Sequence, residues 1–408
     1  MSSNIKAKAT RPRVYARLRP MFGRDAGQPE LFTVVDGTSL DYRKEETSDI
    51  SRFTFDKIFG MDSKQEEVFT TIGEVALSSL RRGFNSTILA YGQTGSGKTF
   101  SMEGAKDKDT GRYTQPGLIP RLFEQIFIKF RSDETIKSFE MSLQFIELYN
   151  EQLQDLLGKR KVLDTPSMDP SGGFQCKDAV RHVCKDALDA QRVYEQGCAM
   201  RATAATRMNE ASSRSHALLQ ISVNWTEQKG KSFGVVNLVD LAGSEGLKKS
   251  GAEGQNAKEG IKINMSLCKL ALTVKCLAEG ATHIPFRESK LTMMLAKGLG
   301  GSNMLHIILA LSNSREQVAE GTACLRFGQS CLSMSVNPSA NKLEKEQAEM
   351  RAVIAEQLQE IADLQSENEN LKLELERAKV SAFERLSSEC RRVPPSATES
   401  LCSPLMAG

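Results

Sequence analysis

The stretch that decides the fold reads Gly92-Gln-Thr-Gly-Ser-Gly-Lys98-Thr99 and matches G-x-x-x-x-G-K-[ST] at every fixed position. It follows the apolar run Ser86–Tyr91, which predicts a buried strand, and a helix is predicted from Lys98 onward. The glycines let backbone N–H groups curl around phosphates, while Lys98 adds a positive charge. Thr99 offers a hydroxyl to Mg²⁺, which prefers oxygen ligands beside phosphates. A glycine-rich turn with a chance lysine is the weaker interpretation.

Outward from this motif, short β-rich runs alternate with helical patterns from about Arg13 to Val336. This alternation is typical of an α/β layered fold. The runs that predict strands are Ser86–Tyr91, Glu140–Leu148, Ala217–Trp225, Phe233–Leu241 and Leu305–Ser312. Helical patterns cover Gln65–Arg82 and Leu118–Phe130. Pro338 then breaks the alternation, because proline continues neither a helix nor a central strand.

Composition excludes several classes of protein. The chain has 408 residues, 40% of them hydrophobic, which is enough for a sizeable core. Its 54 basic and 51 acidic residues leave a net charge of +3, so no global charge attracts nucleic acid or an anionic membrane. The longest apolar stretch, Met304–Leu311, is too short to span a bilayer, and the first residues lack a signal core. Nine cysteines without a Cys-x-x-Cys pair favour reduced thiols in the cytosol.

Two further polar runs can complete a phosphate site. Asp240-Leu-Ala-Gly243-Ser-Glu245 follows a β-branched run, where an aspartate can hold the water shell of Mg²⁺ and Gly243 can bring its N–H to a γ-phosphate. A strand-to-turn junction with a capping aspartate is the alternative. Asn209-Glu-Ala-Ser-Ser-Arg-Ser-His216 clusters hydroxyls and an arginine without apolar spacing, so it predicts either a polar loop or a second part of the site.

In this order and at these separations, the three runs resemble the P-loop, switch I and switch II of a kinesin motor domain. Further segments resemble that family and extend the resemblance over roughly Arg13 to Val336. They are Val14-Tyr-Ala-Arg17-Leu-Arg-Pro20, Phe55-Asp56-Lys-Ile-Phe59, Glu147-Leu-Tyr-Asn150-Glu151, Ile284-Pro-Phe-Arg287-Glu-Ser-Lys290 and Leu325-Arg-Phe327.

The resemblance implies an α/β fold with a central mixed eight-stranded sheet flanked by helices, and an ATP- and Mg²⁺-dependent ATPase. Its nucleotide contacts would be Arg17, Pro20, Gly92, Gln93, Thr94, Gly95, Ser96, Gly97, Lys98, Thr99, Phe100, Asn209 and Ser213. Its catalytic group would be Glu245, Arg214, Lys98, Ser212 and Gly243, with a Glu245–Arg214 salt bridge organising the attacking water. Thr99 and Ser213 would bind the metal, and Asp240 would act through water.

The same resemblance implies microtubules as the partner. The expected microtubule-binding residues are Lys258, Lys262, Lys269, His283, Arg287 and Lys290. An ordinary solvated helix face is the alternative for the lysines, because Met293 stands where the family has an arginine. We expect an arginine at 293 to restore that cation. The segment after Phe327 lacks the family's basic residues, although Met334 can still enter the apolar docking pocket.

Beyond the motor region the hydrophobic period changes to a heptad, which predicts a coiled coil over 342–380. Ile354, Ile361 and Leu375 occupy a, while Leu364 and Leu371 occupy d. Asn368 at a and the g-to-e′ charge spacings favour a parallel homodimer through 343–378. A single amphipathic helix on the motor is the alternative. We expect a flexible N-terminus over 1–12, a motor domain over 13–336, a remnant neck linker over 337–341 and a disordered tail over 381–408.

The residues therefore predict a microtubule-stimulated ATPase motor in the cytoplasm, on the cytoskeleton. A nucleotide-binding protein that holds microtubules with weak or no stepping is the main alternative. An NTPase acting on nucleic acid would need a basic groove with aromatic platforms, and Trp225 is the only tryptophan. Membrane insertion is not expected, and the cargo stays open.

Overall fold

The computed structural model describes residues 11–22, 26–27, 30–43, 50–107, 109–168, 173–205, 214–228, 230–245, 255–314, 317–336 and 338, and eight single residues between 364 and 379. The chain divides into two compact units, Met1–Lys342 and Leu343–Gly408. No helix among the described residues is long and apolar enough to cross a membrane.

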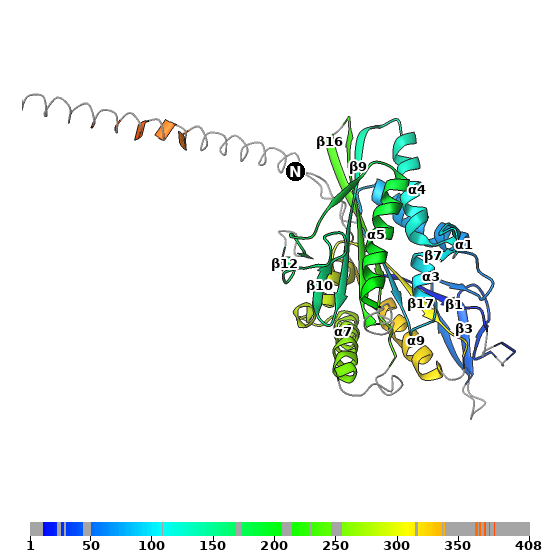
Figure 1. Cartoon of the computed structure of the whole chain (residues 1–408). Helices are drawn as coiled ribbons and strands as arrows, with labels where there is room; N and C mark the ends of the chain where they lie inside the picture. The colour runs from blue at the N-terminus through cyan, green and yellow to red at the C-terminus, as the bar shows by residue number, and fades with distance from the viewer. Residues whose placement is uncertain are drawn as a thin grey trace, which may run out of the picture. The chain divides into compact units, whose positions relative to one another are not determined.

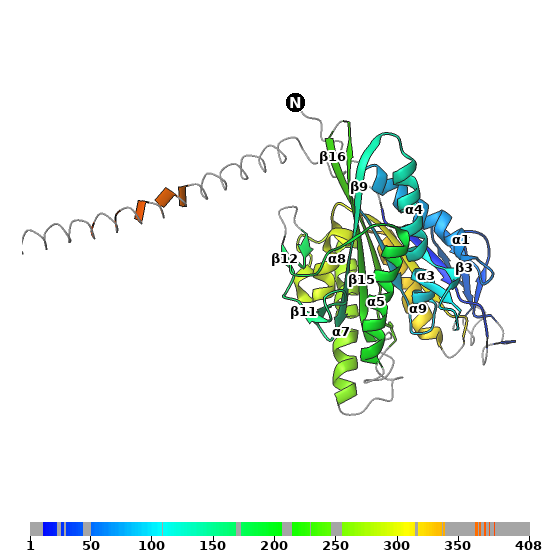
Figure 2. The same cartoon turned by 45° about the horizontal axis from the view of Figure 1, so that its top comes forward.

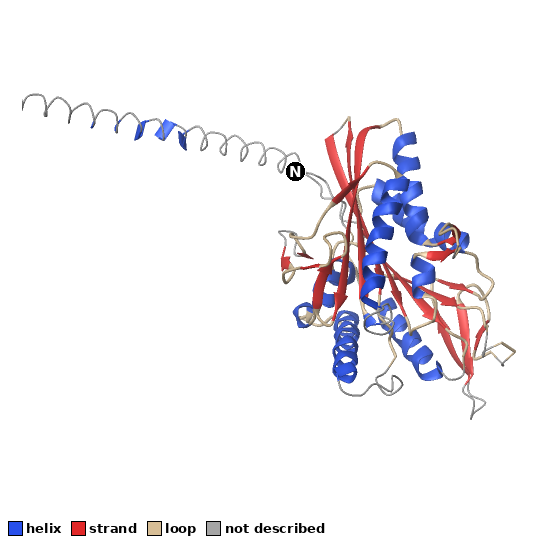
Figure 3. Ribbon diagram, viewed as in Figure 1, coloured by secondary structure: helices blue, strands red, loops and turns tan. Residues whose placement is uncertain are grey.

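A mixed sheet forms the centre of the first unit (Figures 1 and 3). The described residues contribute ten strands to it. Its order is β11-β10-β9-β15-β16-β6-β17-β1-β5, and β14 also pairs with β9. The strands are β1 (Arg13–Leu18), β5 (Lys57–Phe59), β6 (Ser86–Tyr91), β9 (Ile136–Tyr149), β10 (Gln152–Asp155), β11 (Lys161–Val162), β14 (His182–Cys184), β15 (His216–Glu227), β16 (Gly230–Asp240) and β17 (Met304–Leu311). Pairing is parallel from β16 through β6, β17 and β1 to β5, and antiparallel elsewhere.

The mixed sheet is confirmed, but the expected number of eight strands is wrong. The fourteen-residue β9 pairs with β15 along one edge and offers the other edge to two short strands. β10 pairs with its last four residues, and β14 pairs with Met141, Ser142 and Leu143. These edge strands of two to four residues are too short for a hydrophobic period to predict them.

Helices cover both faces of the sheet (Figure 2). The buried apolar residues form two core clusters. One core includes residues of α1 (Gln65–Val68), η2 (Phe69–Gly73), α2 (Glu74–Arg81), α3 (Lys98–Met102), α4 (Leu118–Ser132) and α5 (Ala187–Ala205). The other includes residues of α7 (Gln255–Ala278), α8 (Lys290–Gly300) and α9 (Val318–Leu332). In α4 the apolar residues recur every three or four positions, so they form one buried face.

The predicted helix over Gln65–Arg82 is helical throughout but changes its winding. Phe69–Gly73 forms a π-helical segment between α1 and α2. A Cβ on Gly73 would overlap the ring of Phe69, so only glycine allows this packing. Smaller sheets lie outside the main one: β2 (Phe32–Val34) with β3 (Ser39–Arg43) and β4 (Ile50–Thr54), β7 (Gly104–Lys106) with β8 (Tyr113–Pro116), and β12 (Ser167–Met168) with β13 (Phe174–Gln175).

The segment after α9 continues into the core. Met334 is 2% exposed and belongs to the same apolar cluster as α7, α8 and α9. That this place is the docking pocket stays a prediction. Ser335 is exposed whereas Val336 and Pro338 are buried, so the side chains alternate as in a strand.

In the second unit the described residues are helical. Leu364, Leu371 and Leu375, all predicted for the coiled-coil seam, have 58, 57 and 56% of their surface exposed. The rest of 342–380 lies outside the described residues, as do 1–10 and 381–408. The coiled coil and the flanking segments therefore stay predictions.

We expect Gly328→Val to lower the free energy of unfolding by about 1–3 kcal/mol, because a Cβ there would overlap Leu309 and lie 2.9 Å from Cε1 of Phe55. Gly60→Val is the control, since nothing lies within 4 Å of its Cβ position. Urea unfolding of both variants measures the difference. Equal stabilities would show that α9 does not pack on β17 this closely.

Candidate functional site

The phosphate-binding motif forms a tight loop between β6 and α3. Gly92 has φ +150°, and a Cβ there would overlap the carbonyl oxygen of Ala310 on β17. Gly97, directly before α3, has φ +102°, a backbone conformation that residues with a side chain rarely adopt. The loop therefore needs glycine at both positions to turn from the strand into the helix.

Lys98 lies inside this loop. Its ammonium donates to the carbonyl oxygens of Gly92 and Gln93 at 2.9 and 2.8 Å, and the residue is 6% exposed. Burial lowers the pKa of Lys98, while the nearby Asp240 and Glu245 act in the opposite direction. A buried cation held by backbone carbonyls and facing two carboxylates is well placed to meet phosphate oxygens.

Thr99, at the start of α3, lies beside Asp240, the last residue of β16. The hydroxyl of Thr99 donates to Oδ2 of Asp240 at 2.7 Å. Oδ1 of Asp240 is buried and has no hydrogen-bond partner among the described residues. A small cavity of about 30 Å³ borders both side chains, enough for a water. A hydroxyl, a carboxylate with an unused oxygen and room for water fit a hydrated Mg²⁺ beside phosphates.

Glu245 folds back onto the phosphate loop. Its Oε2 accepts from the backbone N–H of Thr94 at 2.8 Å, and the Thr94 hydroxyl donates to Oε1. The N–H of Ser244 donates to the Gly92 carbonyl at 3.2 Å, so this acidic run is joined directly to the loop. A Cβ on Gly243 would overlap Glu245 and Thr94. The predicted bridge from Glu245 to Arg214 stays a prediction.

His216 joins the acidic run to α7. The N–H of Ala242 donates to Nδ1 of His216 at 3.1 Å, so Nδ1 carries no proton. The opposite nitrogen, Nε2, lies 2.9 Å from the hydroxyl of Ser266 on α7 and donates to it. The imidazole is fully buried, and burial lowers its pKa to about 3, with Arg201 and Lys98 adding to the effect. It is therefore a neutral link between β15, the acidic run and α7.

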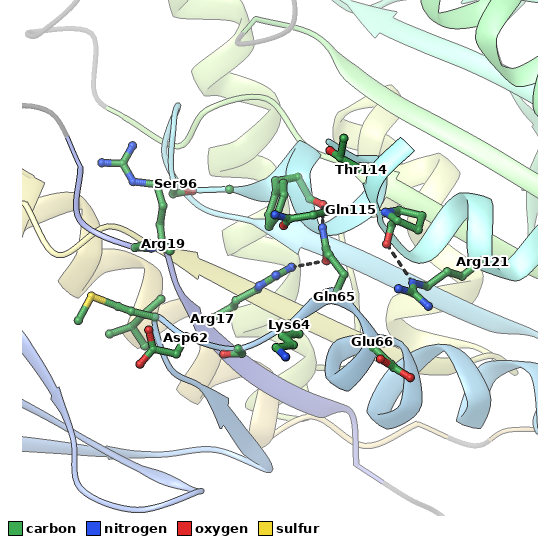
Figure 4. Close-up of a pocket in the computed structure, with 17 residues that line it drawn as sticks. Arg17, Arg19, Asp62, Lys64, Gln65, Glu66, Ser96, Thr114, Gln115 and Arg121 are labelled. Atoms are coloured by element: carbon green, nitrogen blue, oxygen red, sulfur yellow. Dashed lines mark hydrogen bonds between the residues drawn. The ribbon is translucent and has the colours of Figure 1, made fainter. Parts of the chain in front are cut away.

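A pocket of about 450 Å³ lies beside the phosphate loop (Figure 4). Five of the predicted nucleotide contacts line it, namely Arg17, Pro20, Ser96, Gly97 and Phe100. Their contact with a nucleotide stays a prediction. Arg17, however, turns toward Gln65, as Figure 4 shows, and its Nη1 donates to Oε1 of that residue at 2.9 Å. The same nitrogen donates to Oγ of Ser101 at 2.9 Å. Burial lowers the pKa of Arg17 to about 10. The contacts of Arg17 join α1 to α3 rather than leaving its guanidinium open to the pocket.

Sequence reasoning missed two residues at the mouth of the loop. Arg19 donates to the carbonyl of Gly95 at 2.7 Å, and its guanidinium lies over the ring of Phe22. Both line a second pocket of about 470 Å³ with Pro20 and Lys98. Arg19 stands within the quoted Arg17-to-Pro20 segment, so its position next to Pro20 was an available signal.

Comparison with known proteins decides the family. The family model for the kinesin motor domain matches residues 17–334. The chain belongs to the kinesin family. It is 34% identical over 348 residues to the kinesin heavy chain of Syncephalastrum racemosum, covering 84% of this chain and 37% of that protein. This kinesin thus spans less than two fifths of that relative's length.

Solved kinesin structures share its fold. A fast kinesin, described for its ATPase mechanism and interactions with microtubules, has a TM-score of 0.74 and 32% identity, covering 82% of this chain and 95% of that one. A dimeric kinesin in a two-heads-bound state, with AMP-PNP and in complex with a microtubule, has a TM-score of 0.74 and 27% identity. That match covers 83% of this chain and 98% of the other.

Several predicted residues of this kinesin lie outside the described part of the chain. They are Asn209, Ser212 and Ser213, and the side chains of Lys258 and Lys262 on α7. Among the described residues there is no cluster of three or more histidine, cysteine or acidic side chains that could hold a metal. Within the described part of the chain, Thr99 and Asp240 are therefore the side chains that fit a metal beside phosphates.

The predicted microtubule-binding cations are only partly available. His283 and Arg287 are exposed, and Arg287 lies in the short helix η4 (Phe286–Glu288). Lys269 on α7 is engaged, because its ammonium pairs with Glu288. Lys290 begins α8 and is half-buried; its backbone N–H, and not its ammonium group, donates to Glu151 at 2.8 Å.

The gain of a cation from an arginine at position 293 stays a prediction, and the packing of Met293 argues against it. Met293 is 8% exposed and lies among the buried residues of α8. Met293→Arg would therefore replace a packed apolar side chain, so it would disturb α8 before it could offer a cation to a partner.

We expect the free energy of unfolding to fall as the pH drops from 7 to 5. Burial lowers the pKa of His216 to about 3 and that of His306 to about 4, whereas the unfolded value is about 6.5. Below pH 6.5 the unfolded state binds more protons, and each such histidine costs about 1.4 kcal/mol per pH unit until its folded pKa is reached. His216→Gln should flatten the slope of the free energy of unfolding against pH relative to the wild type. Equal slopes in the two proteins would contradict this expectation.

Proposed function

We propose that this chain is a microtubule-stimulated ATPase motor that converts ATP hydrolysis into movement or force along microtubules. The assembly of Lys98, Thr99, Asp240 and Glu245 around one phosphate loop carries the proposal. Phosphoryl transfer needs positioned charge more than covalent chemistry, and these side chains supply it. A kinesin of the same fold has been solved in complex with a microtubule.

In this proposal each side chain has one task. Lys98 and the N–H of Gly243 contact the γ-phosphate, together with Ser212. Thr99 and Ser213 bind Mg²⁺, which neutralises phosphate charge when bound, and Asp240 holds its water. Glu245, released from Thr94, pairs with Arg214 and orients the attacking water. The pocket beside Pro20 and Phe100 receives the base and ribose.

Weak or absent stepping is the second candidate, and the engaged Lys269 favours it. The buried Met293 adds to this, because no arginine is available there. ATP turnover with and without microtubules, together with a gliding assay, distinguishes the two. Stimulated turnover with gliding supports the motor, and microtubule binding without gliding supports the second candidate.

Dimerisation and location belong to the same proposal. We expect a parallel homodimer through 343–378 in the cytoplasm, on microtubules, without nucleic acid as a partner. The exposed Leu364, Leu371 and Leu375 are consistent with a seam that a second copy covers. Sedimentation of the full chain and of a form lacking 341–380 tests the dimer.

We expect Glu245→Ala to keep ATP binding and to lower turnover by about 100-fold or more, because the partner that organises the water is lost. Filter binding measures the first quantity and phosphate release the second. Glu279→Ala, at an exposed surface pair, is the control. Normal turnover in Glu245→Ala would overturn the role assigned to this carboxylate.

We also expect Glu288→Gln to tighten microtubule binding by about two- to fivefold at low salt, since it frees Lys269 to meet the acidic tubulin surface. The gain should shrink as salt rises. Glu279→Gln, which frees Lys275 instead, is the matched control. Cosedimentation measures both. An unchanged affinity at low salt would place Lys269 outside the contact.

A further inference from the structure

A strained turn lies at the edge of the sheet. Lys159 and Arg160, between β10 and β11, have φ of +54° and +61°, the left-handed region that costs a non-glycine residue about 1 kcal/mol or more. The N–H of Arg160 donates to the carbonyl of Asp155 at 2.8 Å, which closes the turn. Lys159 is exposed, whereas Arg160 points inward.

Arg160 reaches a buried carboxylate and a helix. One guanidinium nitrogen lies 2.8 Å from Oε2 of Glu147, whose side chain is 2% exposed. That oxygen accepts no hydrogen bond among the described residues, so the positive charge of Arg160 compensates for its negative charge through the ion pair alone. The other nitrogen donates to the carbonyl of Met200 on α5 at 3.0 Å. The turn is thus held to β9 and to α5 at once.

The next residue of α5 continues the network. Arg201 lies 3.6 Å from Oε1 of Glu147 and 3.9 Å from Oδ2 of Asp240. It also donates to Oγ and to the carbonyl of Ser215, and the Ser215 hydroxyl donates to Glu147 at 2.7 Å. Arg201 is therefore shared between two buried carboxylates, one of which accepts from Thr99.

We infer that Arg160 is a positioning residue for the nucleotide site. Arg160, Glu147, Arg201 and Asp240 alternate in charge from the edge turn to the phosphate loop. Arg160 neutralises part of the negative charge of Glu147, so Arg201 can face Asp240 as well as Glu147. Without Arg160, Glu147 draws Arg201 toward itself, because a buried carboxylate retains its nearest cation. The negative charge of Asp240 is then less neutralised by Arg201, so this carboxylate would hold the water bound to Mg²⁺ more strongly. The inference rests on the nucleotide-binding part of the proposed function.

The test is the release of a fluorescent ADP analogue from the full chain, with Mg²⁺ and with EDTA. We expect Arg160→Met to slow release about fivefold in Mg²⁺ and to change it less than about twofold in EDTA. Lys159→Met, in the same turn, is the matched control and should release the analogue like the wild type. Arg160→Lys keeps the charge and should restore release to within about twofold.

A double-variant comparison separates this role from a structural one. In the Glu147→Gln background the charge that draws Arg201 is absent, so Arg160→Met should have no further effect on release. An equal slowing in EDTA, or in the Glu147→Gln background, would reduce Arg160 to a structural residue of the turn and overturn the inference. Wild-type release by Arg160→Met would also overturn it.

This measurement needs neither microtubules nor movement. A wild-type chain that binds the analogue without stepping would refute the motor and still test Arg160. A wild-type chain that binds no analogue would overturn both proposals.

Discussion

The parallel register between β6 and β16 is the constraint on which the nucleotide site depends. It pairs Ala90 with Asp240, so the phosphate loop and the acidic run leave the sheet at the same edge. A slip of one residue would turn every side chain of β16 to the other face and take Asp240 away from Thr99. Apolar residues alternate between the two cores along both strands, so the burial of both faces holds the register.

The buried charges around this edge fix the positions of side chains more than they raise the free energy of unfolding. Lys98, Arg201 and Asp240 are all mostly buried, and each has contacts from more than one direction. A buried ion pair adds little net stability, yet removing one partner leaves an uncompensated charge that costs several kcal/mol. Each charge is therefore confined to a narrow range of positions. Such confinement is useful where a metal and phosphates must be met in a fixed geometry.

The sequence was sufficient for the elements that form the nucleotide site. The apolar run Ser86–Tyr91 predicted β6 with its observed bounds, and the glycines and Lys98 after it predicted the loop. The inward direction of the Arg17 side chain was not predictable, because its partners Gln65 and Ser101 lie on two helices, α1 and α3, that only the fold brings beside β1. The resemblance named the residue but could not give the direction of its side chain.

The network of ion pairs around Glu147 was also not predicted from the sequence, although one signal was present. Glu147 lies within a run that predicts a buried strand, and a carboxylate in such a strand requires a cation nearby. The run itself does not say which cation, since Arg160 and Arg201 approach from a turn and from a helix that only the fold brings together. Edge strands of two or three residues are missed for a related reason: β14 forms on the free edge of β9 and β11 on the free edge of β10, so neither depends on its own pattern alone.

The acidic run and α7 are joined through a neutral group. His216 accepts from Ala242 in the acidic run and donates to Ser266 on α7, so it spans from the nucleotide side to the helix that carries Lys269. An imidazolium could not accept from Ala242, and burial keeps the ring neutral. Because both hydrogen bonds lie in a packed interior, neither end can shift far without breaking one of them. A displacement of the acidic run must therefore either move α7 with it or leave a buried polar group unpaired.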